Sequence, residues 1–313
     1  MAPTNLDLER REFLKRLAVL GLAAGAGSLL ALPRELWAMA PLEAAPPVVA
    51  RAQGINYANL VGDAIQALGG MKKFVHPGEV VVVKPNMAFD RPPELGANVH
   101  PAVVRQVVEL CLEAGAKQVK VFDHPAYEPR KSYKISGIEA AVRGIRDPRV
   151  SLEFVDERRF VAVQAEKART LKTWHYYRDV LEADRFINLA VAKHHSSAGL
   201  TMCLKNMMGA IGGNRRTLHV KLNQNIADMN LILRPDLHVL DATRIMVKNG
   251  PSGGRLEDVE VRNLVFAGTD PVALDACGTT LFGLKPADIG HIVKAHQAGR
   301  GEMDLSRIKV LGA

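Results

Sequence analysis

The residues best able to do chemistry gather in one stretch, residues 193–219, which reads KHHSSAGLTMCLKNMMGAIGGNRRTLH. The apolar spacing across residues 200–211 predicts a helix buried on one face, started by one of the two serines and ended by the glycines. Free N–H groups at such a helix start, beside His194 and His195, favour an anion or a carboxylate-bearing ligand. A capped core helix followed by a glycine loop would give the same pattern without any ligand.

Lysines and asparagines of this stretch, together with Lys84 and Asn86, can hold a small anion, because lysine supplies a point charge and asparagine fixes orientation by hydrogen bonds. If residues 198–208 are helical, Thr201 and Lys205 lie on one face, and Lys205 meets the site rather than the core. His195 is the expected proton-transfer residue because imidazole titrates near neutrality, and Asp241 can orient it. The expected catalytic residues are Lys205, His195 and Asp241, and the expected substrate-binding residues are Lys84, Asn86, Lys193, Asn206 and His219.

A mixed nitrogen and oxygen site for a divalent metal is the alternative use of the same region. The side chains with suitable atoms are His194, His195, His219 and Asp123 or Asp241. Neighbours in an extended segment point to opposite faces, so His194 and His195 do not both bind one metal unless the chain bends. Asp123, His124 and His194 are the ligand set expected on this alternative.

Several familiar sites are excluded by their missing motifs. The sequence has no HExxH, P-loop, GxGxxG or GxSxG, which argues against the usual zinc peptidase, nucleotide, dinucleotide and serine hydrolase sites. The three cysteines, Cys111, Cys203 and Cys277, lie far apart without a CxxC, so the chain is not expected to hold an iron–sulfur cluster of its own. Buried free thiols are the ordinary expectation, and a single disulfide, in an oxidising location, is the alternative.

The charge balance favours a small partner. The formal net charge is +8 with 5% aromatic residues, and no Lys/Arg tract interleaved with aromatic residues is present. Nucleic acid is therefore not an expected partner. A small anionic ligand suits a mildly basic protein, although a solvated basic surface accounts for the same charge.

The elements that would position these residues form a repeating pattern of strands and helices. Residues 79–83 read as a buried strand, residues 101–114 as a helix with proline in its first turn, and residues 119–122 as a second buried strand. This βαβ unit implies parallel strands and a right-handed crossover. Further strands are expected at residues 152–155, 186–191, 237–240, 264–267 and, at an edge, 308–311. Further helices are expected at residues 59–68, 138–145, 177–183, 220–233, 271–282 and 289–298. An excursion or hairpin is expected within residues 160–171. The predicted fold class is α/β, a doubly wound, mostly parallel sheet with helices on both faces.

In such a sheet, ligands bind beyond the carboxyl ends of the strands. Five expected strands end in polar residues: Lys84 and Asn86, Asp123 and His124, Lys193 to His195, Asp241, and Thr269 with Asp270. These ends predict one shared rim. Local explanations compete at two of them, because Asp270 before Pro271 suits a helix cap and Asp123-His124-Pro125 suits a turn.

The amino-terminal segment has the features of an export signal. Residues 10–15, RREFLK, resemble the twin-arginine motif and precede an apolar stretch at 17–32 that is short for a membrane span. Residues 38–40, AMA, fit a cleavage site, but Pro41 after them is unfavourable, so an uncleaved membrane tether is the alternative. This predicts the twin-arginine machinery as a partner and a periplasmic or other extracytoplasmic location. The expected organisation is a signal region at 1–40, a linker at 41–53 and a single α/β domain at 54–313.

Several motifs together resemble the domain of unknown function 362 family. They are VVVKPNM at 81–87, HPAVVRQVVELCLEAGAKQVKVFD at 100–123, LAVAKHHSSAGLTMCLKNMMGAIGG at 189–213, residues 237–241, NGPSGG at 249–254 and AGTDPVALDACG at 267–278. Many members of this family carry ferredoxin-type cysteine motifs, so the resemblance implies an association with iron–sulfur redox chemistry and a redox partner. This sequence lacks those cysteines. A fold-level analogy to the nickel-pincer lactate racemase suggests a carboxylate substrate.

Two functions from different classes follow. The first is an exported enzyme, redox or isomerase-like, that acts on a small carboxylate or phosphate at the strand-end rim, with or without a divalent metal. The second is a non-catalytic metal- or anion-binding accessory protein that serves an iron–sulfur redox partner.

Overall fold

The valines of strand β2 (Val80–Pro85) show how one sheet divides the molecule into two packed layers. The computed structural model describes residues 45–312. Val81 and Val83 pack into one apolar core, whereas Val82 between them packs into another on the opposite face of the sheet. This alternation is the period of two that a strand covered on both faces requires.

The main sheet of the described residues has nine strands. Besides β2 they are β1 (Val48–Gln53), β3 (Gln118–Val121), β4 (Val150–Leu152), β7 (Arg185–His195), β8 (Gly199–Thr201), β9 (Leu237–Met246), β10 (Val259–Gly268) and β11 (Lys309–Gly312). Their order is β11-β1-β10-β9-β7-β2-β3-β4, and β8 pairs with β7. Strands β9, β7, β2, β3 and β4 are mutually parallel, and β1 is parallel to the edge strand β11.

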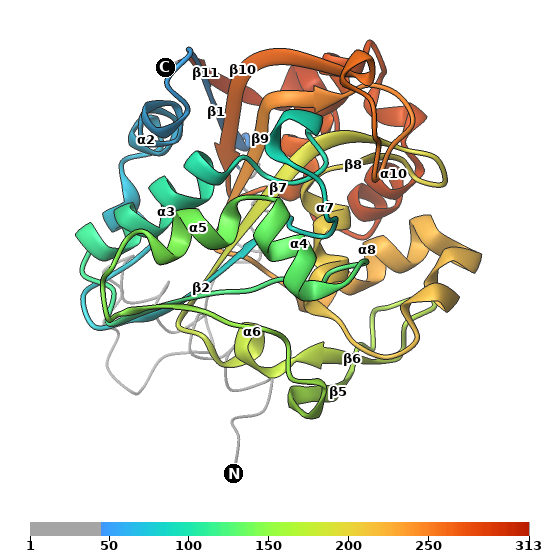
Figure 1. Ribbon diagram of the computed structural model, residues 1–313. Coiled ribbons are helices and arrows are strands. Elements are labelled where there is room, and N and C mark those ends of the chain that lie inside the picture. Colours follow the sequence, from blue (N-terminus) through green and yellow to red (C-terminus); the bar gives the residue numbers. More distant parts are fainter. Residues whose placement is uncertain (1–44, 313) are drawn as a thin grey trace, which may run out of the picture. The chain divides into compact units, whose positions relative to one another are not determined.

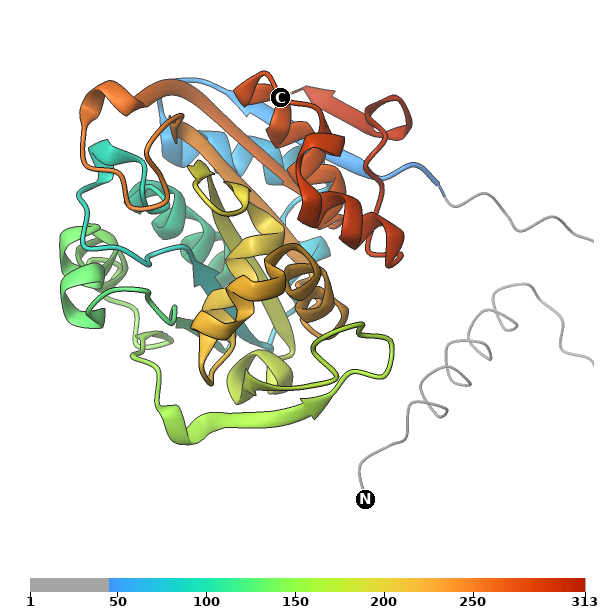
Figure 2. The ribbon, with the colours of Figure 1, turned by 90° about the vertical axis from the view of Figure 1, so that its right-hand side faces the viewer.

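Helices cover both faces of this sheet (Figures 1 and 2). One core takes side chains from α2 (Tyr57–Ala67), α3 (Pro101–Glu113), α4 (Pro129–Ile135) and α5 (Ile138–Arg143). The other takes them from α6 (Arg178–Glu182), α7 (Cys203–Asn206), α8 (Leu222–Ile232), α9 (Pro271–Thr279) and α10 (Gly290–Gln297). The predicted doubly wound, mostly parallel α/β fold is confirmed.

A small hairpin lies apart from the main sheet. Strands β5 (Phe160–Gln164) and β6 (Thr173–Tyr177) pair antiparallel in a sheet of their own, which resolves the excursion expected in this region. The expected signal region at 1–40 lies outside the described residues. Within 45–312, no helix combines the length and the apolar character needed to cross a membrane.

Strand β1 corrects the expected linker at residues 41–53. Val48–Gln53 pairs with both β10 and β11 inside the sheet. The Pro/Ala composition of residues 41–47 suggested a linker, but Val49 and Ala50 are fully buried, so the folded body begins before residue 54.

Strand β10 corrects the expectation that five strand ends share one rim. It runs antiparallel to β9, so Thr269 and Asp270 leave it at the opposite edge of the sheet. Asp270 instead caps α9, where its carboxylate accepts the N–H groups of Val272 and Ala273. Residues 247–258, which join β9 to β10, contain no α-helix, and parallel neighbours need a longer crossover.

The prediction of a helix over residues 200–211 is also wrong. Leu200 and Thr201 belong to β8, which folds back on the end of β7 through a turn at Ser196–Ala198. Gly199 follows that turn with φ +74°, a conformation that favours glycine. The helical part is the four-residue α7, followed by a 3-10 turn, η5 (Met207–Ala210).

Candidate functional site

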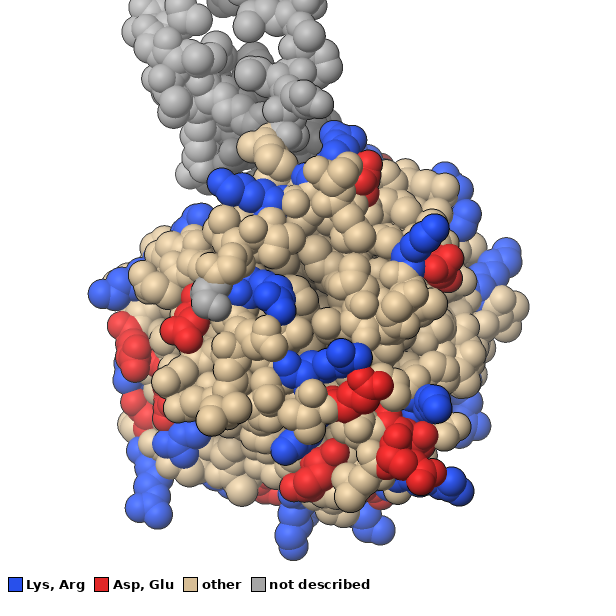
Figure 3. Space-filling view, turned by 90° about the horizontal axis from the view of Figure 1, so that it is seen from above, with Lys and Arg blue, Asp and Glu red and all other residues tan. Residues whose placement is uncertain are grey.

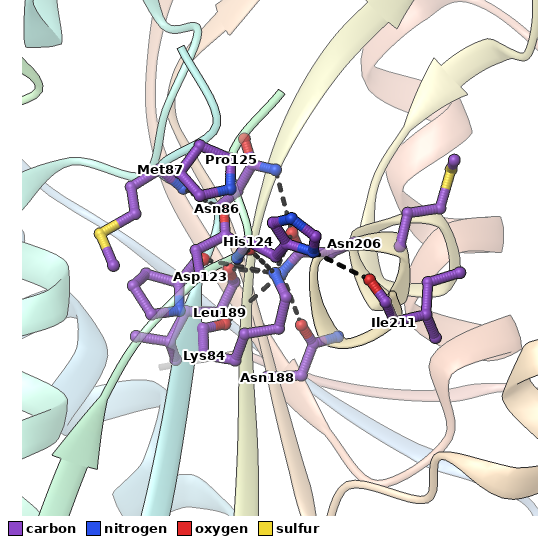
Figure 4. Close-up of polar contacts among 12 residues, drawn as sticks. Lys84, Asn86, Met87, Asp123, His124, Pro125, Asn188, Leu189, Asn206 and Ile211 are labelled. Carbon is purple, nitrogen blue, oxygen red and sulfur yellow. Dashed lines mark hydrogen bonds and ion pairs between the residues drawn. The ribbon is translucent and has the colours of Figure 1, made fainter. Parts of the chain in front are cut away.

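A buried ion pair joins the ends of β2 and β3. Lys84 continues the alternation of β2 onto the face of Val82, and its side chain is 0% exposed. Its Nζ lies 2.7 Å from Asp123 Oδ1, just beyond β3 (Figure 4). The other carboxylate oxygen of Asp123 accepts the N–H of Met87 at 3.0 Å. Burial lowers the pKa of Lys84, and the Asp123 charge opposes that shift.

Asn206 at the end of α7 joins this pair to β7. Its Oδ1 accepts hydrogen bonds from Lys84 Nζ and Asn86 Nδ2, both at 2.9 Å. Its Nδ2 donates to Asn188 Oδ1 at 2.7 Å and to the Leu189 carbonyl at 2.9 Å (Figure 4). All the strong hydrogen-bonding positions of this amide are thereby occupied, which fixes its orientation.

Lys193 reaches the same network from the end of β7. Its Nζ donates to Asn86 Oδ1 at 2.9 Å and to the Ala97 carbonyl, and it lies 4.6 Å from the centre of the Phe89 ring. Burial lowers its pKa well below the usual value, and the Lys205 charge adds to the effect. Lys84, Asn86, Asp123 and Lys193 are therefore brought together, as expected from the strand ends, and Asn206 joins them from α7.

A cavity of about 530 Å³ lies against this network. Most of the expected site residues line it: Asn86, Asp123, His124, Lys193, His195, Lys205, Asn206 and His219. Its wall also includes Phe89, Glu157, Thr201, Met208, Gly209, Asn214, Arg215 and Arg216, which were not among the expected site residues. The volume suits a small molecule.

Lys205 is a buried cation of this wall with a single weak partner. It is 9% exposed, and its Nζ makes one hydrogen bond, to Met208 Sδ at 3.6 Å. Among residues 45–312, no carboxylate lies within ion-pair distance of it. Burial, and then the Arg215 charge, lower its pKa to about 8. Thr201 lines the same cavity as Lys205, although a strand rather than the expected helix carries it.

His195 is held neutral, which corrects the reason for expecting proton transfer there. Burial, and then the charges of Lys205 and Lys193, lower its pKa to about 3. Its Nδ1 accepts the N–H groups of Ser197 at 3.1 Å and Ala198 at 3.3 Å, so the ring proton belongs on Nε2. At neutral pH His195 is thus a hydrogen-bond donor and not a base that titrates nearby.

Asp241 does not join the cavity. It pairs with Val191 in the middle of β9 and shares a face with Val239, on the α3 side of the sheet. Its carboxylate accepts the N–H of His100, the cap of α3, at 2.7 Å and that of Thr243 at 2.8 Å. Its expected catalytic role is therefore not supported, because it anchors backbone rather than orienting His195.

The expected metal ligands do not converge either. Asp123 is paired with Lys84, and His194 Nδ1 accepts the N–H of Gly250 at 3.1 Å. His124 Nδ1 lies 3.0 Å from the Ile211 carbonyl, and its Nε2 lies 3.3 Å from Glu157. Across residues 45–312, no group of three His, Cys, Asp or Glu side chains is arranged to hold a metal ion.

Arg215 and Gly209 are the most informative residues missed from the sequence. The guanidinium of Arg215 donates to the carbonyls of His124 and Pro125, both at 2.7 Å, and so ties the segment after Gly213 to the end of β3. Gly209 packs directly on the Lys84–Asp123 pair. Arginines and glycines are present in the stretch of residues 193–219, but nothing in their spacing shows which of them would reach the cavity.

The comparisons with known proteins match the chain to one family model, Domain of unknown function (DUF362), over residues 81–280. The Thylakoid-associated protein sll1697 of Synechocystis sp. is 29% identical over 244 residues, which are 75% of this chain and 73% of that protein. Two solved structures share 13% and 12% identity at TM-scores of 0.42: a Thermotoga maritima protein and the lactate racemase apoprotein of Thermoanaerobacterium thermosaccharolyticum. They match 78% and 81% of this chain, which spans 60% and 59% of their lengths.

Proposed function

The chain belongs to the DUF362 family, whose model spans every residue lining the cavity, and we propose that it is an enzyme acting on a small carboxylate or phosphate held there. One observation carries this proposal. Lys205 presents a buried ammonium to the cavity, and no carboxylate of the described residues neutralises it. A buried cation without a partner is unfavourable, and an anionic ligand would supply the missing charge.

The other charges of the cavity wall support an anion. Its basic side chains are Lys193, Lys205, Arg215 and Arg216, and its acidic ones are Asp123 and Glu157. Asp123 is already paired with Lys84, which leaves a clear positive excess. On the outer face seen in Figure 3, by contrast, basic and acidic side chains are interspersed. The positive excess of the cavity thus comes from the side chains of its own wall.

The reaction we propose is redox or isomerase-like, with Lys205 as the proton-transfer group. A lysine whose pKa is lowered to about 8 exists in both protonation states near neutrality, which general acid–base catalysis requires. His195, neutral with its proton on Nε2, would donate a hydrogen bond to an oxygen of the substrate. Lys193 and Asn86 are held by each other and would orient the ligand.

Calorimetry on the full chain tests this site. Glycolate represents a small carboxylate and sulfate represents a phosphate-like anion. Lys205→Met is expected to weaken binding of the preferred anion about 10- to 100-fold, the loss of one hydrogen bond to a charged group. Lys117→Met, at an exposed lysine outside the cavity wall, is the matched control and should bind like the wild type. Equal affinity in both variants, or no binding of either anion, contradicts the proposal.

Turnover separates the enzyme from the accessory protein. A binding protein would retain the anion and the effect of Lys205→Met on affinity, but it would convert no small carboxylate or phosphate. No observation within residues 45–312 favours the accessory role over the enzyme.

We also propose that Arg10 and Arg11 direct export by the twin-arginine route to an extracytoplasmic location. The motif and the apolar residues 17–32 support this, and a relative named as thylakoid-associated is consistent with a membrane-bounded location. Replacing Arg10 and Arg11 together by lysine is expected to leave the protein in the cytoplasm, while Lys15→Arg should be exported normally. Cell fractionation followed by immunoblotting checks both. Normal export of the double variant would rule the route out.

A further inference from the structure

The amine of Lys205 is positioned as a nucleophile as well as a charge. We propose, on the basis of the function above, that Lys205 forms a Schiff base with the carbonyl carbon of an anionic carbonyl compound such as a 2-oxo acid. The inference deepens the proposed function because it names the class of substrate and the atom that reacts with it.

The support of Lys205 is rigid although its amine is nearly free. Asp275 of α9 accepts the N–H groups of Cys203 at 2.7 Å and Leu204 at 3.0 Å, which fixes the start of α7. Asn206 is fixed by its four partners at the other end. Between them, the Nζ of Lys205 makes one hydrogen bond, to the sulfur of Met208, which is a weak acceptor. The amine is thus held at the cavity wall without a partner that would compete for its lone pair.

The groups around this amine favour its neutral form. Arg215, Lys193, His195 and the buried His291 are the titratable groups whose charges act on Lys205 or respond to its charge, and none is acidic. Burial and Arg215 lower the pKa of Lys205 to about 8. Compared with an ordinary lysine, the fraction of free amine near neutral pH is larger by about two orders of magnitude. Lysines activated in this way are typical Schiff-base formers.

The proposed step is balanced without a co-reactant. The lone pair of Nζ adds to the carbonyl carbon, and the π electrons move to oxygen, which takes up the proton released by nitrogen. The resulting carbinolamine then gains a proton and loses its oxygen as water, which leaves a protonated C=N bond. Thr201 Oγ1 is buried in this wall and has no hydrogen-bond partner among the described residues, so it is available to bind the oxygen of the carbinolamine. The protonated imine would withdraw electrons from the adjacent carbon and favour proton transfer there.

Reductive trapping tests this step. The full chain is incubated with pyruvate and sodium cyanoborohydride, and intact and peptide mass spectrometry locate the reduced adduct. One adduct is expected, on Lys205, formed faster as the pH rises toward 8. Lys205→Arg keeps the charge but should abolish trapping, and Lys117→Arg should trap like the wild type. Lys205→Met serves the same purpose if the arginine variant does not fold, as judged by circular dichroism.

The outcomes separate this inference from the proposed function. Anion binding without an adduct on Lys205, or labelling spread over exposed lysines and unchanged in Lys205→Arg, overturns the Schiff base and leaves the anion site standing. Absence of binding for glycolate, sulfate and pyruvate together overturns the anion site itself. A single adduct that disappears in both Lys205 variants supports both proposals.

Discussion

Replacing Asp123 with asparagine is expected to destabilise the fold by about 3–5 kcal/mol, because it leaves the ammonium of Lys84 buried without its counter-ion. Lys84 and Asp123 are 0% and 1% exposed, so water cannot solvate the ammonium once its counter-ion is lost. Asparagine preserves the shape of the side chain, so the loss reports the charge and the acceptor that one carboxylate oxygen provides to a backbone N–H, rather than a cavity. Urea unfolding measures it.

The sign of the pH dependence follows from Lys84. Burial already lowers its pKa in the folded protein, and removing Asp123 removes the charge that opposes this shift. In the variant, the unfolded chain then binds more protons than the folded one as the pH rises toward the ordinary lysine pKa, so stability rises with pH. The loss of stability should thus be largest near pH 6 and smaller near pH 9.

The double variant Lys84→Met/Asp123→Asn should recover much of the lost stability, because it removes the buried ammonium together with its counter-ion. Wild-type stability of Asp123→Asn at pH 6 would contradict this account of the pair.

Gly209→Ala is the second large effect expected, and it acts on the same pair from another element. A Cβ at Gly209 would lie 2.6 Å from Lys84 Cε and 2.7 Å from Lys84 Nζ, and it would collide with the carboxylate of Asp123. Overpacking of this kind costs about 1–3 kcal/mol, and separating the buried pair adds to it, so we expect a loss of about 3 kcal/mol or more. Thermal unfolding followed by circular dichroism gives the comparison.

Gly62→Ala is the matched control for this experiment. Gly62 lies inside α2, and a Cβ there would meet nothing within 4 Å. Alanine stabilises a helix interior by about 0.5–1 kcal/mol relative to glycine, so this variant should unfold at a slightly higher temperature. If both alanine variants unfold alike, Gly209 does not have the tight packing described above.

Much of the fold follows from sequence periodicity. The unbroken valine run of β2, the helix of α3 and the strand β3 were predicted with their order and parallel direction, because alternation and helix caps are local signals. The direction of β10 was not predicted. A polar residue can follow a strand that runs parallel or antiparallel to its neighbour, so its presence does not distinguish the two directions. The useful signal was the absence of a helix between β9 and β10, which indicates a hairpin.

The sequence predicted correctly those site residues whose position depends only on the end of a strand. Lys84, Asn86, Asp123 and Lys193 meet because their strands are parallel neighbours. Asp241 was misplaced because its strand continues for five residues beyond it, to Met246, and turns its side chain toward α3. The depressed pKa of His195 could not be predicted, because it depends on burial and on lysines that only the tertiary fold brings near.

The pH dependence of anion binding tests the central claim most directly. Glycolate and sulfate keep their charge between about pH 6 and pH 10, so a change in their affinity reports the protein. Lys205 loses its proton as the pH passes about 8, and the affinity of the wild type is therefore expected to fall through that pH. Lys205→Met should bind weakly and show no such step near pH 8, whereas Lys117→Met should follow the wild type. A wild-type affinity that stays constant from pH 6 to pH 10, or a step near pH 8 that survives in Lys205→Met, would contradict the assignment of Lys205 as the group that holds the anion.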